Sequence, residues 1–140
     1  MKPGKDFIGV GVGAFIINDK NELLMLLRAK DSSIEPGTWM IPGGKVDYNE
    51  KMEDTVKREI REEIGVDLDV VEAIKTNDHI LPDQHWVTTT FLCKIKSGEP
   101  KILEPHKHDN IKWFQLNKMP ENLSIATKNS IRAYREKYGK

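Results

Sequence analysis

The sequence predicts an α/β protein in which strands and two helices pack as a sandwich. Runs of small, β-branched and aliphatic residues in the first part of the chain are typical of strands. In two later segments, residues 51–64 and 123–138, the apolar residues recur at helical spacing instead. Strands that flank and alternate with two amphipathic helices indicate a layered α/β arrangement.

The first strands are expected near the N-terminus. Residues 10–17 alternate small and branched side chains, which predicts a strand that lies close to other backbone. After a turn at NDKNE, residues 23–29 form an apolar run that predicts a buried strand with Arg28 at its end. The segment SSIEPGTW is predicted as a loop, and residues 39–42 as a short extended piece before a Gly-Gly pair.

A helix is predicted over residues 51–64, where the period of the apolar residues changes. These residues recur at every fourth place: Met52, Val56, Ile60 and Ile64. Gly65 follows at the point where the C-terminus of a helix favours a left-handed residue.

The rest of the chain predicts two paired strands, a short strand and a second helix. Residues 66–80 and 85–95 alternate or are rich in β-branched and aromatic residues, and LPDQ between them predicts a turn. Residues 111–116 predict a short strand after a polar loop, and residues 123–138 close the chain as an amphipathic helix.

Length and composition indicate a single domain, residues 1–140. A chain of 140 residues with 38% hydrophobic residues can bury one ordinary core. The 22 basic and 22 acidic residues cancel, so no net field attracts nucleic acid or a membrane, and we expect neither as a partner. The single cysteine, Cys93, lies in an apolar run and cannot form an internal disulfide. No segment is typical of a signal peptide or a membrane span, so a cytoplasmic location is expected.

Three glutamates on the predicted helix, Glu59, Glu62 and Glu63, need a physical explanation. On a helical wheel Glu59 and Glu63 adjoin or enter the apolar stripe, and Glu62 lies further round. A Glu-rich helix can simply be a solvated face, but these carboxylates repel one another at i,i+3 and i,i+4 beside the core. Arg58 can reach Glu62 at i,i+4, yet one guanidinium cannot neutralise three carboxylates.

A divalent cation would compensate these charges. Oxygen ligands with no His or Cys nearby favour a hard ion, Mg²⁺ first and Mn²⁺ second. Gly43 and Gly44 precede the helix by a loop; glycine lets the backbone approach a ligand, and a carbonyl there can complete the coordination. The sequence therefore predicts a magnesium site.

The spacing of these residues resembles the Nudix box, G-x5-E-x7-R-E-U-x-E-E-x-G-U, in which U is a bulky aliphatic residue. Gly44, Glu50 and residues 58–66 match every specified position. The resemblance covers most of the chain, through segments similar to the family's strand ending in Arg, its W-x-x-P-G-G approach and its last strand with the L-P turn: residues 24–28, 39–44, 111–116 and 119–120.

The resemblance implies a fold, a reaction and supporting residues. The expected fold is a Nudix-type α/β/α sandwich with a mixed, strongly twisted sheet and a loop-helix-loop catalytic motif. The expected reaction is Mg²⁺-dependent hydrolysis of a nucleoside diphosphate linked to another group X. By position, the carbonyl of Gly43 is a metal ligand, while Gly44 and Glu50 support the site. Relatives often have Gly and Ser or Thr where this chain has Asn49 and Lys51, which affects the loop shape and helix capping rather than the ligands.

The same resemblance implies metal-binding and catalytic roles for Glu59, Glu62 and Glu63, with Arg58 as the residue that orients them. Phosphoryl transfer needs positioning and charge neutralisation more than a protein nucleophile, and carboxylates that hold Mg²⁺ supply both. Glu59 is the first candidate to take a proton from the attacking water. Glu104, in the loop before the last strand, is a rival base but also fits a solvated loop residue.

Residues outside the motif indicate the substrate less directly. Arg28 can clamp a phosphate or pair with a surface acid, and Trp86 can stack on a base or belong to the core. His106 and His108 flank Lys107 in a predicted loop with Glu104 and Asp109, where a metal site is one interpretation and exposed loop residues are the expected one. Pro82 follows the box at a spacing similar to that of Nudix proteins that hydrolyse ADP-ribose, whereas the short chain resembles members that cleave nucleoside triphosphates.

The predicted substrate is therefore a nucleoside triphosphate, cleaved to the monophosphate and pyrophosphate, with ADP-ribose as the alternative. A second class of function is a Nudix module that senses a nucleotide without cleaving it. The complete set of Glu59, Glu62 and Glu63 favours hydrolysis, because a binding domain has no need of it. Small relatives often pair, so the resemblance leaves both a monomer and a homodimer open.

Overall fold

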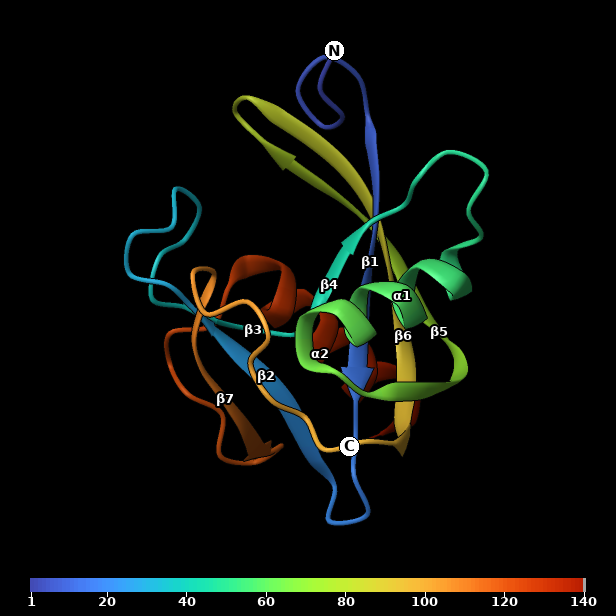
Figure 1. The fold of residues 1–140 in the computed structure, drawn as a ribbon, viewed down its shortest axis with the longest axis vertical. Coiled ribbons are helices and arrows are strands. Elements are labelled where there is room, and N and C mark those ends of the chain that lie inside the picture. Colours follow the sequence, from blue (N-terminus) through green and yellow to red (C-terminus); the bar gives the residue numbers. More distant parts are fainter. Residues whose placement is uncertain (140) are drawn as a thin grey trace.

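The computed structural model describes residues 1–139, and every predicted strand and both predicted helices are present (Figure 1). The elements follow in the order β1 (Gly9–Ile16), β2 (Glu22–Arg28), β3 (Trp39–Met40), β4 (Gly43–Lys45), α1 (Met52–Ile64), β5 (Asp67–Leu81), β6 (Gln84–Ser97), β7 (His108–Gln115) and α2 (Ile125–Tyr138). Neither helix is long and apolar enough to span a membrane.

The strands form two sheets. One has the order β4-β1-β6-β5 and the other β3-β2-β7. β1 runs parallel to β6, and all other pairs are antiparallel, so the larger sheet is mixed, as predicted. β1 and β6 pair from Gly9 with Trp86 to Ile16 with Cys93, which fixes the faces on which their side chains lie.

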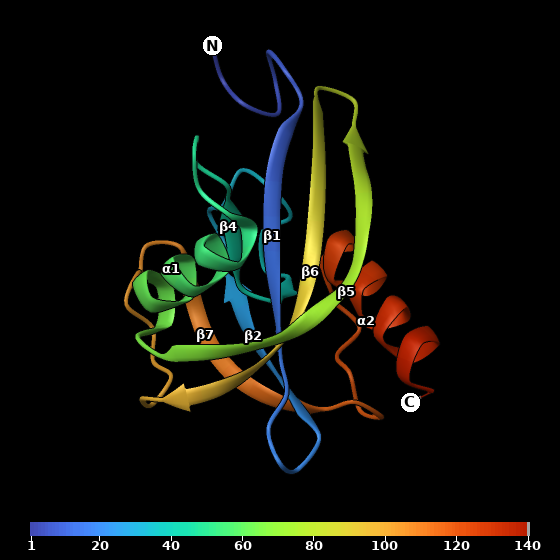
Figure 2. The same cartoon turned by 90° about the vertical axis from the view of Figure 1, so that its right-hand side faces the viewer.

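The two helices cover opposite sides of the strands, which gives the predicted α/β/α sandwich (Figure 2). Successive side chains of a strand point to opposite faces, so β1 and β2 contribute to two cores. The core under α1 includes Val12, Leu24 and Ile60, and the core under α2 includes Phe15, Met25 and Ile131. Cys93 is buried in the first core, as its apolar context predicts.

Three boundaries differ from those predicted. Gly43 begins strand β4, where it pairs with Gly13 of β1, whereas the predicted extended piece ends at residue 42. β7 begins at His108 instead of residue 111, because its first residues pair with the end of β2. The pairing of β5 with β6 extends to Leu81 and Gln84, so the turn between the two strands contains only Pro82 and Asp83.

Candidate active site

Helix α1 presents the three glutamates at three depths. Glu63 is 5% exposed. The side chain of Glu59 is 19% exposed and that of Glu62 is 56% exposed. The order agrees with the helical wheel, on which Glu63 enters the apolar stripe, Glu59 adjoins it and Glu62 lies beyond it. The prediction that two carboxylates lie at the edge of the core is confirmed.

Arg58 is surrounded by four carboxylates. Its Nε donates to Glu50 Oε2 at 2.7 Å and its Nη2 to Glu50 Oε1 at 2.9 Å, a bidentate pair. Nη1 donates to Glu59 at 3.0 Å and lies 3.4 Å from Glu62, while Nη2 lies 3.3 Å from Asp47. The hydrogen bonds to Glu50 are the main cause of the raised pKa of Arg58. Arg58 therefore reaches Glu62 as predicted, but Glu50 is its closest partner.

Glu50 joins the loop before α1 to the helix. Besides Arg58, Thr55 Oγ1 donates to Glu50 Oε1 at 2.8 Å. These two hydrogen bonds, the one from Arg58 first, lower the pKa of Glu50 to about 2. Asn49 and Lys51 differ from the residues that the family often has, and they lie in the loop before α1 and at its N-cap. Asn49 takes a left-handed φ of 65°, and Lys51 at the N-cap makes no side-chain capping bond.

Two glycines allow close approaches that a side chain would block. A Cβ on Gly44 would lie 2.2 Å from Cδ of Glu59, so the missing side chain makes room for that carboxylate. A Cβ on Gly43 would lie 2.2 Å from the carbonyl oxygen of Val12, which belongs to the neighbouring strand. Gly44 therefore makes room for a functional group, and Gly43 for the backbone of β1.

We expect Gly44→Ala and Gly43→Ala to have different effects. In Gly44→Ala the Glu59 side chain can move away, so thermal unfolding should change little while hydrolysis falls at least tenfold. In Gly43→Ala the clash is with backbone, so we expect a loss of about 1–3 kcal/mol in the free energy of unfolding. Denaturant unfolding and initial rates measured on both variants check this. Equal stabilities and equal rates in the two variants would contradict it.

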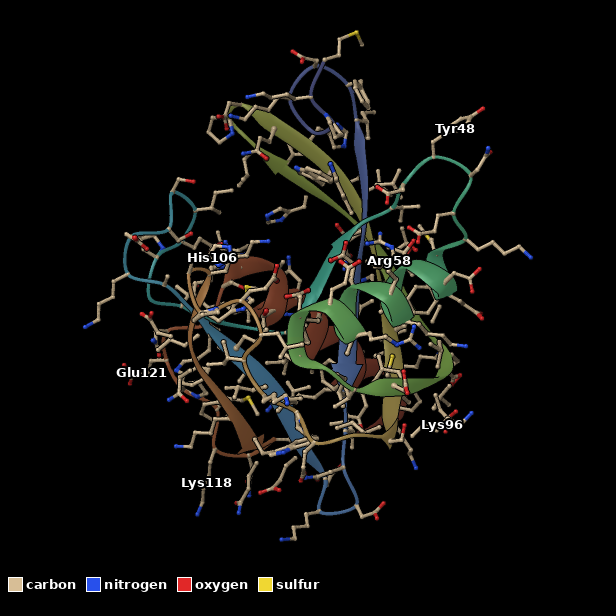
Figure 3. All side chains as sticks on the ribbon, viewed as in Figure 1. Tyr48, Arg58, Lys96, His106, Lys118 and Glu121 are labelled. Carbon is tan, nitrogen blue, oxygen red and sulfur yellow. The ribbon has the colours of Figure 1, made fainter. Side chains whose placement is uncertain are left out.

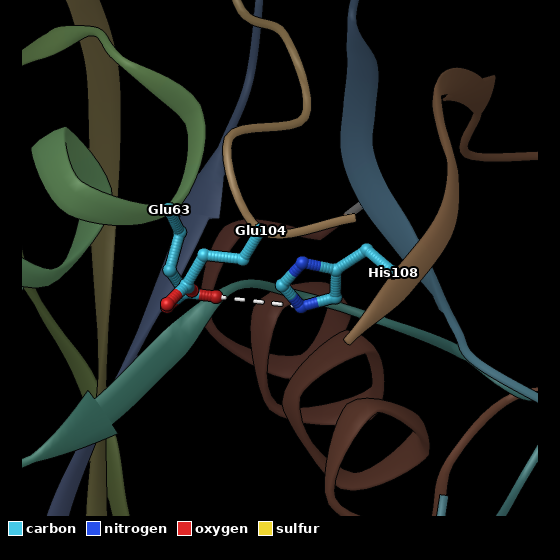
Figure 4. A group of neighbouring side chains, drawn as sticks. All are labelled: Glu63, Glu104 and His108. Carbon is cyan, nitrogen blue, oxygen red and sulfur yellow. Dashed lines mark ion pairs between the residues drawn. The ribbon is translucent and has the colours of Figure 1, made fainter. Parts of the chain in front are cut away.

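A second group of side chains meets Glu63 from β7 and the loop before it (Figure 4). Atoms of Glu63, Glu104 and His108 that can ligate a metal all lie within 4.8 Å of one another. Nε2 of His108 lies 3.6 Å from Oε2 of Glu63. Glu104 is thus part of the site, as the rival-base prediction requires. The expectation that His108 is exposed is wrong, because it is 4% exposed, whereas His106 is exposed as predicted.

The acidic group formed by Glu63, Glu104 and His108 fits a divalent cation. Burial, and next the negative charges of Glu59 and Glu104, raise the pKa of Glu63 to about 8. Burial is also the main cause of the raised pKa of Glu59 and the lowered pKa of His108. Glu63 Oε1 and His108 Nδ1 are buried and have no hydrogen-bond partner among the described residues. Buried polar atoms without partners are rare, and carboxylate oxygens suit Mg²⁺ or Mn²⁺. The premise that no His lies near the carboxylates is wrong, because His108 adds a ring nitrogen to the group.

A cleft of about 260 Å³ lies between the strands and the start of α2. Gly43 and Gly44 form one side of it, and hydroxyl groups of Thr88, Thr90 and Ser130 form another. Thr90 and Ser130 hydroxyls are 2.8 Å apart, which links β6 to α2. The cleft is therefore lined mainly by small, apolar and hydroxyl-bearing residues next to the acidic residues, and Arg28 is the charged residue in its lining.

Arg28 and Trp86 lie at different places around this cleft. Arg28 lines it, with its Nε bonded to Met40 Sδ at 2.9 Å and its Nη1 to the carbonyl of Ile34 at 3.0 Å. Trp86 lies on β6 two residues before Thr88 and so on the same sheet face, with its ring against Gly9. The phosphate-clamp and base-stacking roles stay predictions.

The sequence places His108 near Glu104 but favours exposure over a metal site, because it predicts the strand to start at residue 111. A strand that starts at His108 instead buries this side chain against Glu63. Thr55 is a site residue that the sequence does not indicate. Thr55 lies at a helix position where threonine is usually unremarkable, and only the fold of the preceding loop brings it to Glu50.

Comparison with known proteins places the chain in a family. The profile of the NUDIX domain matches residues 8–134. The chain belongs to the Nudix family. A solved MutT NUDIX hydrolase from Burkholderia pseudomallei is 37% identical, with a TM-score of 0.85 over 91% of this chain and 98% of that one. The predicted family and the α/β/α fold are confirmed.

Curated Nudix relatives include hydrolases of nucleotides. An 8-oxo-dGTP diphosphatase of Proteus vulgaris is 35% identical over 81 residues, 58% of this chain and 72% of the relative. The nucleoside triphosphatase NudI of Escherichia coli is 28% identical over 129 residues, 84% of this chain and 90% of the relative. The chain spans only 27% of the length of a Caenorhabditis elegans relative that is 30% identical. These matches support a hydrolase of phosphoric anhydride bonds in small nucleotides, in a family that generally uses divalent metals.

Proposed function

We propose that this Nudix protein is a Mg²⁺-dependent pyrophosphohydrolase that cleaves nucleoside triphosphates to the monophosphate and pyrophosphate. One observation carries the proposal: the buried carboxylate of Glu63, with an unpaired oxygen, faces Glu104 and His108 next to an open cleft. Buried carboxylates that repel one another are unfavourable by themselves. A divalent cation and the phosphates of a substrate would make the same arrangement favourable.

The proposed metal ligands are the carboxylates of Glu59, Glu62 and Glu63 and the carbonyl of Gly43. Glu104 lies close enough to Glu63 to add a further oxygen. The predominance of oxygen donors favours Mg²⁺, with Mn²⁺ as a substitute. When bound, such an ion neutralises phosphate charge and lowers the pKa of water.

Glu59 is the proposed general base. One of its oxygens accepts a hydrogen bond from Arg58 at 3.0 Å, which holds the side chain in place. The other, Oε2, lies over Gly44, a residue that lines the cleft. Burial raises the pKa of Glu59, and a base whose pKa lies nearer to neutrality takes up a proton more readily. Glu104 is the rival base, and it forms an ion pair with Lys107 at 3.3 Å.

Nucleoside triphosphates are the preferred substrate class because two relatives with good coverage act on them by name, an 8-oxo-dGTP diphosphatase and a nucleoside triphosphatase. The largely uncharged cleft beside Gly43 and Gly44, in which Arg28 is the charged lining residue, would take the nucleoside. ADP-ribose is the second candidate, since Pro82 has the spacing described above and lies in the turn between β5 and β6.

A nucleotide panel tests the proposal. We expect hydrolysis of canonical and 8-oxo nucleoside triphosphates with Mg²⁺, less with Mn²⁺, and none after EDTA treatment. Chromatography should show the monophosphate, and a coupled assay should show pyrophosphate rather than orthophosphate. If ADP-ribose alone is cleaved, ADP-ribose and not a nucleoside triphosphate is the substrate. If calorimetry shows nucleotide binding but no nucleotide of the panel is hydrolysed, the protein is a sensing module and not an enzyme.

We also propose that residues 1–140 act as one domain on free nucleotides in the cytoplasm, without a nucleic-acid or membrane partner. The equal numbers of acidic and basic residues support this view, since they give no net attraction to polyanions. Gel filtration with light scattering would distinguish a monomer from the homodimer that small relatives often form.

A further inference from the structure

A second cavity of about 420 Å³ lies beside the acidic group, between the β2–β3 loop and the loop that leads into β7. Arg28, His106 and Lys107 contribute basic groups to its lining, and Asp31 contributes one acid. Ser32 and Ser33 add hydroxyl groups. The cavity is therefore polar and has more basic than acidic groups. The cleft beside Gly43 and Gly44 differs, because Arg28 is the charged residue in its lining and the others are apolar or carry hydroxyl groups.

The charge of Arg28 is not compensated by a close acid. Its hydrogen-bond partners are the sulfur of Met40 and the carbonyl of Ile34, and no carboxylate among residues 1–139 forms an ion pair with it. Burial lowers the pKa of Arg28, with only a weaker opposing effect from Glu35. A partly buried guanidinium with neutral partners is a favourable site for an anion.

A β-bulge brings the basic groups together. Leu27 pairs with Asn110 and Arg28 with His108, so β7 has one extra residue, Asp109, at this point. The N–H of Ala29 then donates to the carbonyl of Lys107 at 2.9 Å. This pairing fixes the Lys107 backbone beside the end of β2, and thus sets His106 and Lys107 across the cavity from Arg28.

The cavity and the cleft flank the acidic group. Arg28 and Met40 line both spaces. His108, which faces Glu63, lines the cavity, whereas Gly44, which faces Glu59, lines the cleft. A ligand that extends from one space into the other therefore passes Arg28 and the acidic group.

We propose that the cavity lined by Arg28, His106 and Lys107 is an anion subsite for the phosphates of the substrate distal to the nucleoside, and for the pyrophosphate product. This inference rests on the proposed function, because it assigns the cleft beside Gly43 and Gly44 to the nucleoside. It gives the protein a reason to prefer triphosphates over substrates whose distal group is uncharged. Lys107 is a specificity residue in this scheme and takes no part in the proton transfer.

Inhibition by the two products tests the subsite. We expect Lys107→Met to raise the inhibition constant of inorganic pyrophosphate about fivefold, the loss of one charge-assisted contact, and to leave that of the nucleoside monophosphate within twofold. Lys107→Arg should restore pyrophosphate inhibition. Lys118→Met is the matched control, because Lys118 is exposed and lies well away from His106 (Figure 3).

Unchanged pyrophosphate inhibition in Lys107→Met would overturn the subsite, and so would a parallel rise for both products, which would indicate an effect through Glu104. These results would leave the proposed function standing. If instead no nucleotide is hydrolysed, the proposed function fails. The subsite is then tested by calorimetry, in which inorganic pyrophosphate is titrated with Mg²⁺ into the wild type and into Lys107→Met. A fivefold weaker affinity in the variant would support it, and equal affinities would overturn it.

Discussion

Glu62→Gln is expected to lower kcat for nucleoside triphosphate hydrolysis by a factor of about one hundred to one thousand while the protein stays folded. The substitution keeps the size of the side chain and removes a charge that would neutralise the metal. The side chain is 56% exposed and its contacts with Arg58 are 3.4 Å long, so its removal should change the melting temperature by no more than about 1 °C. Initial rates at saturating nucleotide, together with thermal unfolding, measure both effects.

Glu53→Gln is the matched control for this variant. Glu53 is exposed on the first turn of the same helix, nine residues before Glu62, so the activity of Glu53→Gln should stay within twofold of the wild type. If Glu62→Gln and Glu53→Gln hydrolyse nucleotides equally well, Glu62 is neither a metal ligand nor a catalytic residue.

The burial of the glutamates could be predicted from the sequence because it depends on local geometry. Residues of one helix keep fixed angular positions, so the apolar stripe of α1 determines how deep each of its carboxylates lies. The end of the helix also depends on local geometry. Gly65 has a φ of 73°, which lies in the left-handed region that the sequence predicts for this position.

The partners of these glutamates could not be predicted in the same way. Glu104 and His108 reach Glu63 only because β7 pairs with β2 and places its first residue under α1. Gly43 becomes a strand residue because β1 offers an unpaired edge. Such contacts depend on chain segments far apart in sequence, for which propensity and periodicity carry no information.

The burial of Glu63 lowers the stability of the metal-free protein at alkaline pH. Its pKa is about 8 in the fold, against an ordinary value of 4.5, so the folded state binds more protons than the unfolded state between these limits. The free energy of unfolding therefore decreases as the pH rises through this window. A shift of this size corresponds to a few kcal/mol, which is a large part of the stability of a small domain.

Glu63→Gln should therefore stabilise the metal-free protein while it abolishes activity. Glutamine resembles the protonated acid, so the melting temperature of the variant should equal that of the wild type near pH 5 and exceed it by several degrees at pH 8.5. Mg²⁺ should reverse the order, since a ligand that binds only the folded state raises its stability and the variant lacks one carboxylate to bind it. Thermal scans from pH 5 to 9, with EDTA and with Mg²⁺, measure both effects.

The difference between the variant and the wild type is the informative quantity, because shifts of other groups, such as the lowered pKa of Glu50, are common to both proteins and cancel. A difference that does not change with pH would mean that Glu63 is ionised throughout the range, held so by a partner within the protein. An equal gain from Mg²⁺ in both proteins would mean that the ion binds away from Glu63. Either result would separate the acidic group from the metal on which the proposed hydrolysis depends.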